Sequence, residues 1–310
     1  MGSRGEVVVR PLTLAWVARQ LEVGETVVRV EVLHGGITAE MRRLTVGARG
    51  EGVRELVLRS FVDEQCASDW LGREAGALTE LAEATAVPAP ALVAVDPTPE
   101  HCEYPSLLMT HLPGRPILGD EGLEARVPAL ARQLVAIHAV RPVQRPRDYV
   151  ALTTAETVVI PKAADSGVWT AAIDVIRKPA PSYEGRFLHR DFQPGNVLFG
   201  DVQSRITGVV DWAAASWGPA DLDVAHCATN LALLHGPAWG LRFAEAYEQA
   251  GGVLAAVASE RLYWLVRDAL AASEEVQLVA QPWREAGRTD LTMQVVEKRL
   301  NAYVTALMTA

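Results

Sequence analysis

The feature that most constrains this chain is a polar turn with apolar ends, FLHRDFQPGNVLFG, at residues 187–200. Its two ends are typical of short strands, and the Pro-Gly pair in its middle bends the chain. The polar part contains Asp191 and Asn196. A second apolar run at 206–210 alternates as a strand does and ends at Asp211. The sequence therefore predicts two carboxylates and one carboxamide at a common edge.

These side chains have the chemistry of a phosphoryl-transfer centre. Carboxylate and amide oxygens are hard ligands that suit Mg²⁺, and a further carboxylate can act as a general base. The order His-x-Asp, Asn five residues after that Asp, and Asp after the next strand is a phosphoryl-transfer signature. Here it consists of His189, Asp191, Asn196 and Asp211. A polar turn arising by chance is the alternative, but four positions and the flanking strands all fit the signature.

With these residues the chain resembles the aminoglycoside phosphotransferase family, which are small-molecule kinases with a protein-kinase-like fold. The resemblance implies that Asp191 is the catalytic base and that Asn196 and Asp211 hold Mg²⁺. It implies that His189 braces the turn and does not react. Asp223, which follows a Gly-Pro turn, is implied to lie in a helix and to brace the catalytic loop.

The segment after Asp211 argues against a protein kinase. Protein kinases continue with Phe-Gly, a long activation segment and Ala-Pro-Glu. Here only a short loop separates Asp211 from the sequence Gly-Pro-Ala-Asp-Leu-Asp at 218–223, so no peptide-docking segment is evident. His226 follows on the predicted helix and is interpreted as structural, because no Cys/His set with metal-ligand spacing surrounds it.

Residues 55–61 are predicted to form a strand that places Arg59 on a largely apolar face. Such a cation needs a partner. The next segment is a predicted helix, capped by Ser68, whose apolar stripe places Glu74 on the inward side. Kinase folds have a Lys–Glu pair here, and this chain departs by using Arg. We interpret Arg59 as a phosphate ligand held by Glu74, with an ordinary ion pair as the alternative.

Two further segments complete the predicted nucleotide site. A turn between the predicted strands 27–33 and 41–46 contains Gly35, Gly36 and Thr38 and could lie over phosphates, although glycine hairpins are common.

An apolar strand ending in Pro-Gly at 107–114 is a reasonable linker between two lobes. The resemblance implies that the Thr110 carbonyl and the Leu112 amide bind the purine and that Met109 abuts it. An edge strand ending in a turn is the alternative.

Composition limits the partners. The chain of 310 residues is 49% hydrophobic, which is ample for a core, and no stretch is apolar enough to span a bilayer. The formal charge of −9 argues against nucleic acid and mildly favours a cationic substrate. Three scattered cysteines are typical of a reduced cytoplasm. Asp268, on a helix predicted at 260–276, could rim a substrate cleft, but a solvated helix face is the preferred interpretation.

We therefore expect an α+β, two-lobed, protein-kinase-like fold, with a sheet-rich N-lobe at 1–112 and a mostly helical C-lobe at 113–310. The nucleotide should lie between the lobes, and the C-lobe should hold the substrate. The predicted activity is transfer of the γ-phosphate of ATP or GTP to a small-molecule hydroxyl, for example of an antibiotic, in resistance or self-protection. A metabolite kinase acting on a sugar, an amine alcohol or an amino alcohol, and a nucleotide-binding module without catalysis, are the alternatives. The sequence is compatible with both a monomer and a homodimer.

Overall fold

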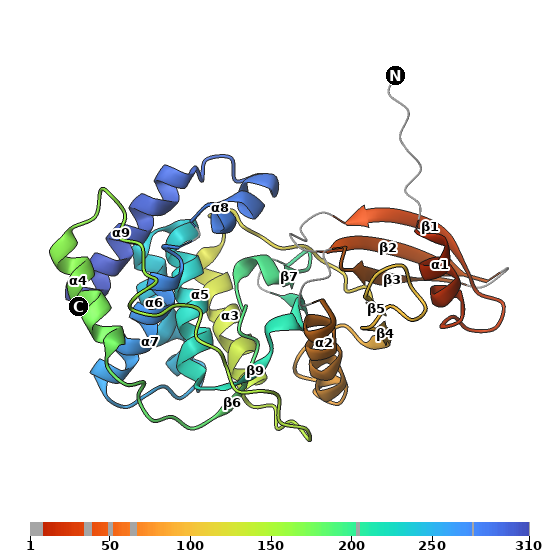
Figure 1. Ribbon diagram of the computed structural model, residues 1–310, viewed down its shortest axis with the longest axis horizontal. Helices are drawn as coiled ribbons and strands as arrows, with labels where there is room; N and C mark the ends of the chain where they lie inside the picture. The colour runs from red at the N-terminus through yellow and green to blue at the C-terminus, as the bar shows by residue number, and fades with distance from the viewer. Residues whose placement is uncertain are drawn as a thin grey trace. The chain divides into compact units, whose positions relative to one another are not determined.

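The computed structural model describes residues 9–33, 39–48, 52–62, 67–202, 205–274 and 276–309. Figure 1 shows its helices and strands in chain order. The chain divides into two compact units, Met1–Glu83 with Ala89–Leu112, and Ala84–Pro88 with Pro113–Ala310. The change of unit after residue 112 coincides with the predicted linker, and the short segment at 84–88 belongs with the second unit.

The first unit is built on a five-stranded antiparallel sheet, with the strands in the order β1-β2-β3-β5-β4. Each strand has the alternating or continuous apolar pattern that fits a sheet with a buried face. The strands are β1 (Thr26–Leu33), β2 (Glu40–Gly47), β3 (Val53–Ser60), β4 (Leu92–Asp96) and β5 (Ser106–Thr110).

Two helices, α1 (Pro11–Ala18) and α2 (Ala67–Leu81), pack on this sheet. Trp16 of α1 belongs to one apolar cluster with Leu56 and Leu58 of β3. Since neighbouring side chains of a strand point to opposite faces, Arg59 lies on the other face, where it meets α2. The apolar stripe predicted for α2 is buried. Ser68 was predicted to cap this helix, but it lies inside α2, which already includes Ala67.

The second unit is mainly helical. Its central helix is α5 (Ala220–His235), which lies among α3, α6 and α7 in Figure 1 and also contacts α9. A helix that is buried all round needs small and apolar residues on every side, and α5 has them. The other helices are α3 (Leu123–His138), α4 (Ser166–Arg177), α6 (Pro237–Gln249), α7 (Ala258–Ala271), α8 (Val276–Glu285) and α9 (Met293–Thr309).

Two small two-stranded sheets carry the polar turn. β6 (Arg186–Leu188) pairs with β9 (Ser216–Gly218), and β7 (Val197–Phe199) pairs with β8 (Ile206–Val209). The strands on either side of the turn therefore pair with later segments and not with each other. The 3₁₀ turn η1 (Pro194–Asn196) lies between β6 and β7, and η2 (Trp212–Ala214) precedes β9.

The α+β class predicted from the sequence is confirmed, because an antiparallel sheet forms the N-terminal part and helices form most of the C-terminal part. Among the described helices, none has both the length and the apolar character needed to cross a membrane.

Candidate active site

The polar turn is held in a shape that few residues adopt freely. Arg190 and Asp211 are the two non-glycine residues of the described ranges with left-handed backbone, at φ 67° and 66°. This region is uncommon for residues with a side chain, so neighbouring groups must fix it.

Asp223, in the first turn of α5, is the main fixing group. Its fully buried carboxylate accepts hydrogen bonds from the backbone amides of His189 and Arg190, both at 2.8 Å. His138 of α3 donates to the same carboxylate at 3.3 Å and contacts the Tyr247 hydroxyl at 2.7 Å. Burial opposes the charge, but the His138 hydrogen bond and the nearby cations hold the pKa of Asp223 below its usual value. The arrangement fits the implied brace.

His189 connects the turn to the end of β8. Its ring Nε2 donates to the Val210 carbonyl at 3.0 Å, and its Nδ1 accepts from the Asp191 amide at 3.2 Å. Burial lowers the pKa of His189, so the ring is neutral and its two nitrogens are both used within the protein. This geometry supports a bracing role and leaves no ring nitrogen for a substrate.

Asp191 presents a carboxylate that is fixed and still accessible. Oδ2 accepts from Asn196 Nδ2 at 2.8 Å, and Oδ1 accepts from His226 Nε2 at 3.0 Å. The side chain nevertheless keeps 34% of its surface exposed. Although burial raises the pKa of Asp191, the hydrogen bond and charge of His226 outweigh it and lower the pKa overall. Asp191 is therefore ionised at neutral pH.

Asn196 and Asp211 can supply the oxygens of a magnesium site. The Asn196 amide nitrogen donates to the Asp191 carbonyl and carboxylate, which leaves its Oδ1 as a ligand. The Val210 amide donates to the Asn196 carbonyl at 3.0 Å. Asp211 is the residue directly after Val210 in the chain. No group of three or more Asp, Glu, His and Cys side chains suited to a metal occurs in the described ranges. Mg²⁺ does not need such a group of side chains, because it is held by one or two protein ligands, phosphates and water.

In the first unit the predicted ion pair is present. Arg59 Nη1 lies 2.9 Å from Glu74 Oε2, and the two side chains are 8% and 1% exposed. The guanidinium also lies 4.9 Å from the ring centre of Phe61. In the β3–β5 register Arg59 faces Leu107, two residues before Met109, so Met109 is on the same face of the sheet as Arg59.

The remaining predicted nucleotide residues are located as follows. Thr110 ends β5, and its hydroxyl accepts from the Ala91 amide at 2.9 Å. Leu112 is the last residue of the first unit. Gly35, Gly36 and Thr38 lie outside the described residues.

The sequence decides the family. A model of the "Phosphotransferase enzyme family" matches residues 29–263, which is more than half of the chain. The chain belongs to this family. The resemblance inferred from the polar turn is thereby confirmed. No curated protein sequence matches the chain.

Solved structures of small-molecule phosphotransferases share the fold of this phosphotransferase. A thermostable mutant of aminoglycoside phosphotransferase APH(4)-Ia with ADP and hygromycin B is 19% identical, with a TM-score of 0.59 over 90% of this chain and 94% of that chain. Macrolide 2'-phosphotransferase type I is 18% identical, with a TM-score of 0.59 over 95% and 99%. Amicoumacin kinase hAmiN with AMP-PNP, Ca²⁺ and Ami is 12% identical, with a TM-score of 0.61 over 89% and 88%. The predicted kinase-like fold is confirmed.

The sequence did not predict the contacts of His226 and Asp268 in this phosphotransferase. Asp268 was interpreted as solvated, but it is only 6% exposed and bonds to the His226 ring. A signal was available only for the contact of His226 with the catalytic loop, because His226 lies three residues after Asp223 and so one helical turn from the brace.

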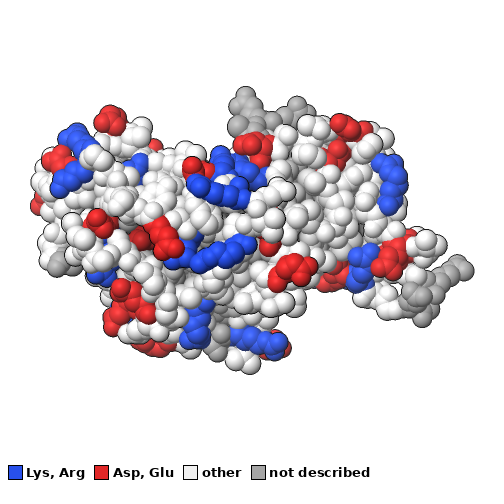
Figure 2. All heavy atoms as spheres, turned by 90° about the horizontal axis from the view of Figure 1, so that it is seen from below, with Lys and Arg blue, Asp and Glu red and all other residues white. Residues whose placement is uncertain are grey.

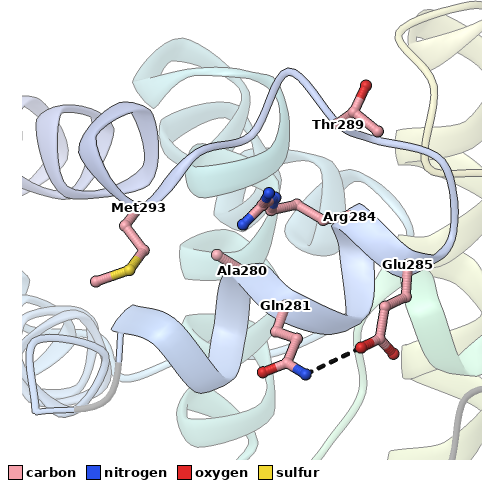
Figure 3. A pocket seen from close by; sticks show the side chains of 6 residues that line it. All are labelled: Ala280, Gln281, Arg284, Glu285, Thr289 and Met293. Carbon is pink, nitrogen blue, oxygen red and sulfur yellow. Dashed lines mark hydrogen bonds between the residues drawn. The ribbon is translucent and has the colours of Figure 1, made fainter.

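A separate pocket lies beside α8, with a volume of about 450 Å³. Figure 3 shows its side chains on α8, on the segment that follows and at the start of α9, with Gln281 bonded to Glu285 at 2.9 Å. Neither Asp191 nor either proposed metal ligand lines it. The lining residues are Ala280, Gln281, Arg284, Glu285, Thr289 and Met293.

Acidic and basic side chains are mixed on the face drawn in Figure 2, and no broad basic surface is visible among the described residues there. On this face, therefore, no concentrated basic patch accompanies the formal net charge of −9.

Proposed function

We propose that this phosphotransferase transfers the γ-phosphate of ATP or GTP to a hydroxyl of a small molecule. The observation that carries the proposal is the Asp191 carboxylate. It is ionised, held at both oxygens and still one-third exposed. Such a group can orient a substrate hydroxyl and take its proton as the phosphoryl group is transferred.

Asn196 and Asp211 are proposed to hold the metal ion of the nucleotide. Mg²⁺ bound there would neutralise charge on the triphosphate. His189 and Asp223 keep the loop in shape, so that Asp191 and the metal ligands remain in register. Most of the acceleration is then expected from positioning and charge neutralisation.

Arg59, oriented by Glu74, is proposed to bind the nucleotide phosphates through its planar guanidinium. We assign the purine to the backbone of Thr110 and Leu112 and to the side chain of Met109. The predicted turn with Gly35, Gly36 and Thr38 would contact the phosphates. The related structures determined with ADP and with AMP-PNP support a nucleotide co-substrate.

For the substrate we propose an antibiotic that carries a hydroxyl, which would make the protein a resistance or self-protection enzyme. The related structures support this class, because they are named for aminoglycosides, macrolides and amicoumacin. The net charge of −9 favours a cationic member of the class. The buried, free Cys102 and Cys227 are compatible with a reduced, cytoplasmic setting.

The test is a turnover screen. ADP or GDP release is measured with MgATP and MgGTP against hygromycin B, other aminoglycosides, macrolides, peptide and nucleoside antibiotics, sugars and amino alcohols. Mass spectrometry should find one added phosphoryl group on the accepted compound, and the Asp191→Asn variant is the control. A protein that hydrolyses no nucleotide and phosphorylates no compound would instead be a nucleotide-binding module without catalysis.

A further inference from the structure

The Asp191 carboxylate belongs to a chain of three side chains from three elements. His226 of α5 contacts Asp191 Oδ1 with Nε2 at 3.0 Å and Asp268 Oδ1 with Nδ1 at 3.1 Å. The His226 side chain is 17% exposed and that of Asp268 is 4% exposed. A single ring therefore lies between the proposed catalytic carboxylate and a carboxylate of α7.

Both ring nitrogens of His226 face acceptors, so both must carry a proton if each contact is a hydrogen bond. A neutral ring would direct a lone pair at one carboxylate. Asn230 Nδ2 also lies 3.2 Å from Nε2, but it donates to the His226 carbonyl at 2.9 Å. Two further titratable groups near Asp268, Cys227 of α5 and Tyr303 of α9, stay neutral because burial raises the pKa of each.

The electrostatics agree with this proton count. Burial alone would favour the neutral ring, but Asp268 and Asp191 outweigh it and raise the pKa of His226 to about 10. The ring is therefore an imidazolium at neutral pH, and its positive charge lies between the two aspartates.

We propose that His226 is a positioning residue of the phosphotransfer reaction, and that its imidazolium, anchored on Asp268, fixes the orientation of the Asp191 carboxylate. The proposal rests on the proposed function of Asp191. Asn196 holds Oδ2 and His226 holds Oδ1, so rotation of the carboxylate is blocked from both sides. A carboxylate has about four acceptor sites. Oδ1 also accepts from Gln193 Nε2 at 3.5 Å, whereas Oδ2 accepts only from the Asn196 side chain among the described residues and keeps a site for a substrate hydroxyl. Without the ring, Asp191 would lose one hydrogen bond and a neighbouring positive charge.

Removal of His226 should impair the orientation of the Asp191 carboxylate and should not impair nucleotide binding. Residues that hydrogen-bond to metal ligands typically contribute about 10–100-fold to metal affinity or activity. We expect a contribution of the same order from His226, which holds a reacting group in the same way. The His226 ring contacts Asp191, Asp268 and Asn230, none of which is a proposed nucleotide or metal ligand. Its removal should therefore lower kcat while KM for ATP stays unchanged. Asp268 acts only through His226, so its effect should disappear once His226 is replaced.

The experiment measures ADP release from MgATP with water as the acceptor, so that no substrate has to be known. The variants are His226→Gln, Asp268→Asn and the double variant. We expect His226→Gln to lower kcat by about 10–100-fold with KM within about twofold, Asp268→Asn to lower it less, and the double variant to match His226→Gln. His235→Gln is the matched control, because His235 is on the same helix and also contacts an aspartate, Asp120. It should leave kcat unchanged.

A second measurement is independent of turnover. Nitrogen NMR of histidine-labelled protein at pH 8, assigned with the His226→Gln variant, should find both ring nitrogens of His226 protonated. A neutral His226 ring, an unchanged kcat in His226→Gln, or additive losses in the double variant would each overturn the proposal. Asp191→Asn is measured alongside. If it keeps full turnover, the proposed function of Asp191 fails, whereas its loss together with a fully active His226→Gln rejects the role of His226 alone.

Discussion

Asp191 has the two properties that a catalytic base needs, a charge at neutral pH and an accessible surface. The hydrogen bond and charge of His226 are the main causes that hold the pKa of Asp191 below its usual value, and the side chain is 34% exposed. Replacing Asp191 by Asn keeps the shape but removes the charge and the ability to take a proton. We expect a loss on the order of 10²–10⁴ in kcat with nearly unchanged nucleotide affinity. Turnover of the accepted substrate and nucleotide titration measure the two effects, and wild-type turnover in this variant would remove Asp191 from the mechanism.

Asp211 is the charged member of the proposed metal pair. Asn in its place keeps an oxygen but loses the negative charge that attracts Mg²⁺. The Asp211→Asn variant should therefore need a markedly higher Mg²⁺ concentration for half-maximal turnover. Magnesium titrations of both proteins at fixed ATP measure this requirement, and overlaying curves would mean that Asp211 is not a ligand.

At the residue scale the sequence predicted what depends on local order. His189, Asp191, Asn196 and Asp211 occur within a short stretch whose spacing is diagnostic, and the structure brings them together. The contact between His226 and Asp268 joins residues 42 positions apart on two helices. No spacing rule encodes such a contact, because it depends on how α5 packs on α7.

Among the elements, β3 carries the proposed phosphate ligand Arg59, and α2 carries its partner Glu74. If Arg59 binds phosphate with its fork, Arg59→Lys keeps the charge but loses a hydrogen bond, at a cost of about 1–2 kcal/mol in nucleotide binding. Arg59→Ala should cost more, and Glu74→Ala should weaken nucleotide use because Arg59 is no longer oriented. Nucleotide affinity and melting temperature are measured on all three variants.

The control for this series is Arg54→Ala on the same strand, because Arg54 also forms an ion pair, with Glu25 at 2.7 Å. It should leave nucleotide affinity unchanged, since Arg54 has no proposed contact with the nucleotide. If Arg59→Ala likewise changes only the melting temperature, the pair is purely structural and the phosphate role is wrong.

Helix α5 carries two histidines whose contributions to stability depend on pH in opposite ways. The pKa of His226 is raised from 6.5 to about 10 by Asp268 and Asp191, against the effect of burial. The stabilisation from protonated His226 is complete below pH 6.5 and is lost as pH rises through about 10.

Burial lowers the pKa of His235 to about 4. Its buried Nε2 has no hydrogen-bond partner in the described structure, so protonation there is costly. The stabilisation from neutral His235 is present above pH 6.5 and is lost as pH falls through about 4.

Chemical denaturation from pH 4 to pH 10 separates the two histidines. The free energy of unfolding of wild type minus that of His226→Gln should fall as pH rises above 6.5. The same difference for His235→Gln should fall as pH drops below 6.5. Parallel curves for wild type and His226→Gln would mean that the ring has an ordinary pKa.

Element predictions held where a periodic pattern was long. Strands β1, β2, β3 and β5 and helix α2 were expected from alternation or from an apolar stripe. The run predicted as one helix at 260–276 is divided, since α7 ends at Ala271 and α8 begins at Val276. α8 was not predicted, and it contains Pro282, a residue that usually ends a helix. The pairing of β6 with β9 was not predicted either, because strands of three residues carry too short a pattern.

At the scale of the molecule, the fold class followed from the order of the predicted elements. Strands dominate up to the linker and helices dominate after it, which is typical of an α+β chain. The assignment of segment 84–88 to the second unit could not be predicted. It depends on tertiary hydrogen bonds, such as those from Val209 to the Pro88 carbonyl at 2.8 Å and from Gln133 to the Ala86 carbonyl at 3.2 Å.

Binding of the nucleotide should be detectable in both units, because the proposed phosphate ligand Arg59 belongs to the first and the metal ligands Asn196 and Asp211 to the second. At about 100 times its Kd, MgATP stabilises the bound form by about 2.7 kcal/mol. Hydrogen exchange with and without MgATP should therefore slow in β3 and α2 and also around η1 and β8. Mg²⁺ alone is the control and should protect neither unit to the same degree. Asp211→Asn should reduce protection around η1 and β8 more than in β3. Protection confined to one unit would mean that the residues assigned in the other do not bind the nucleotide.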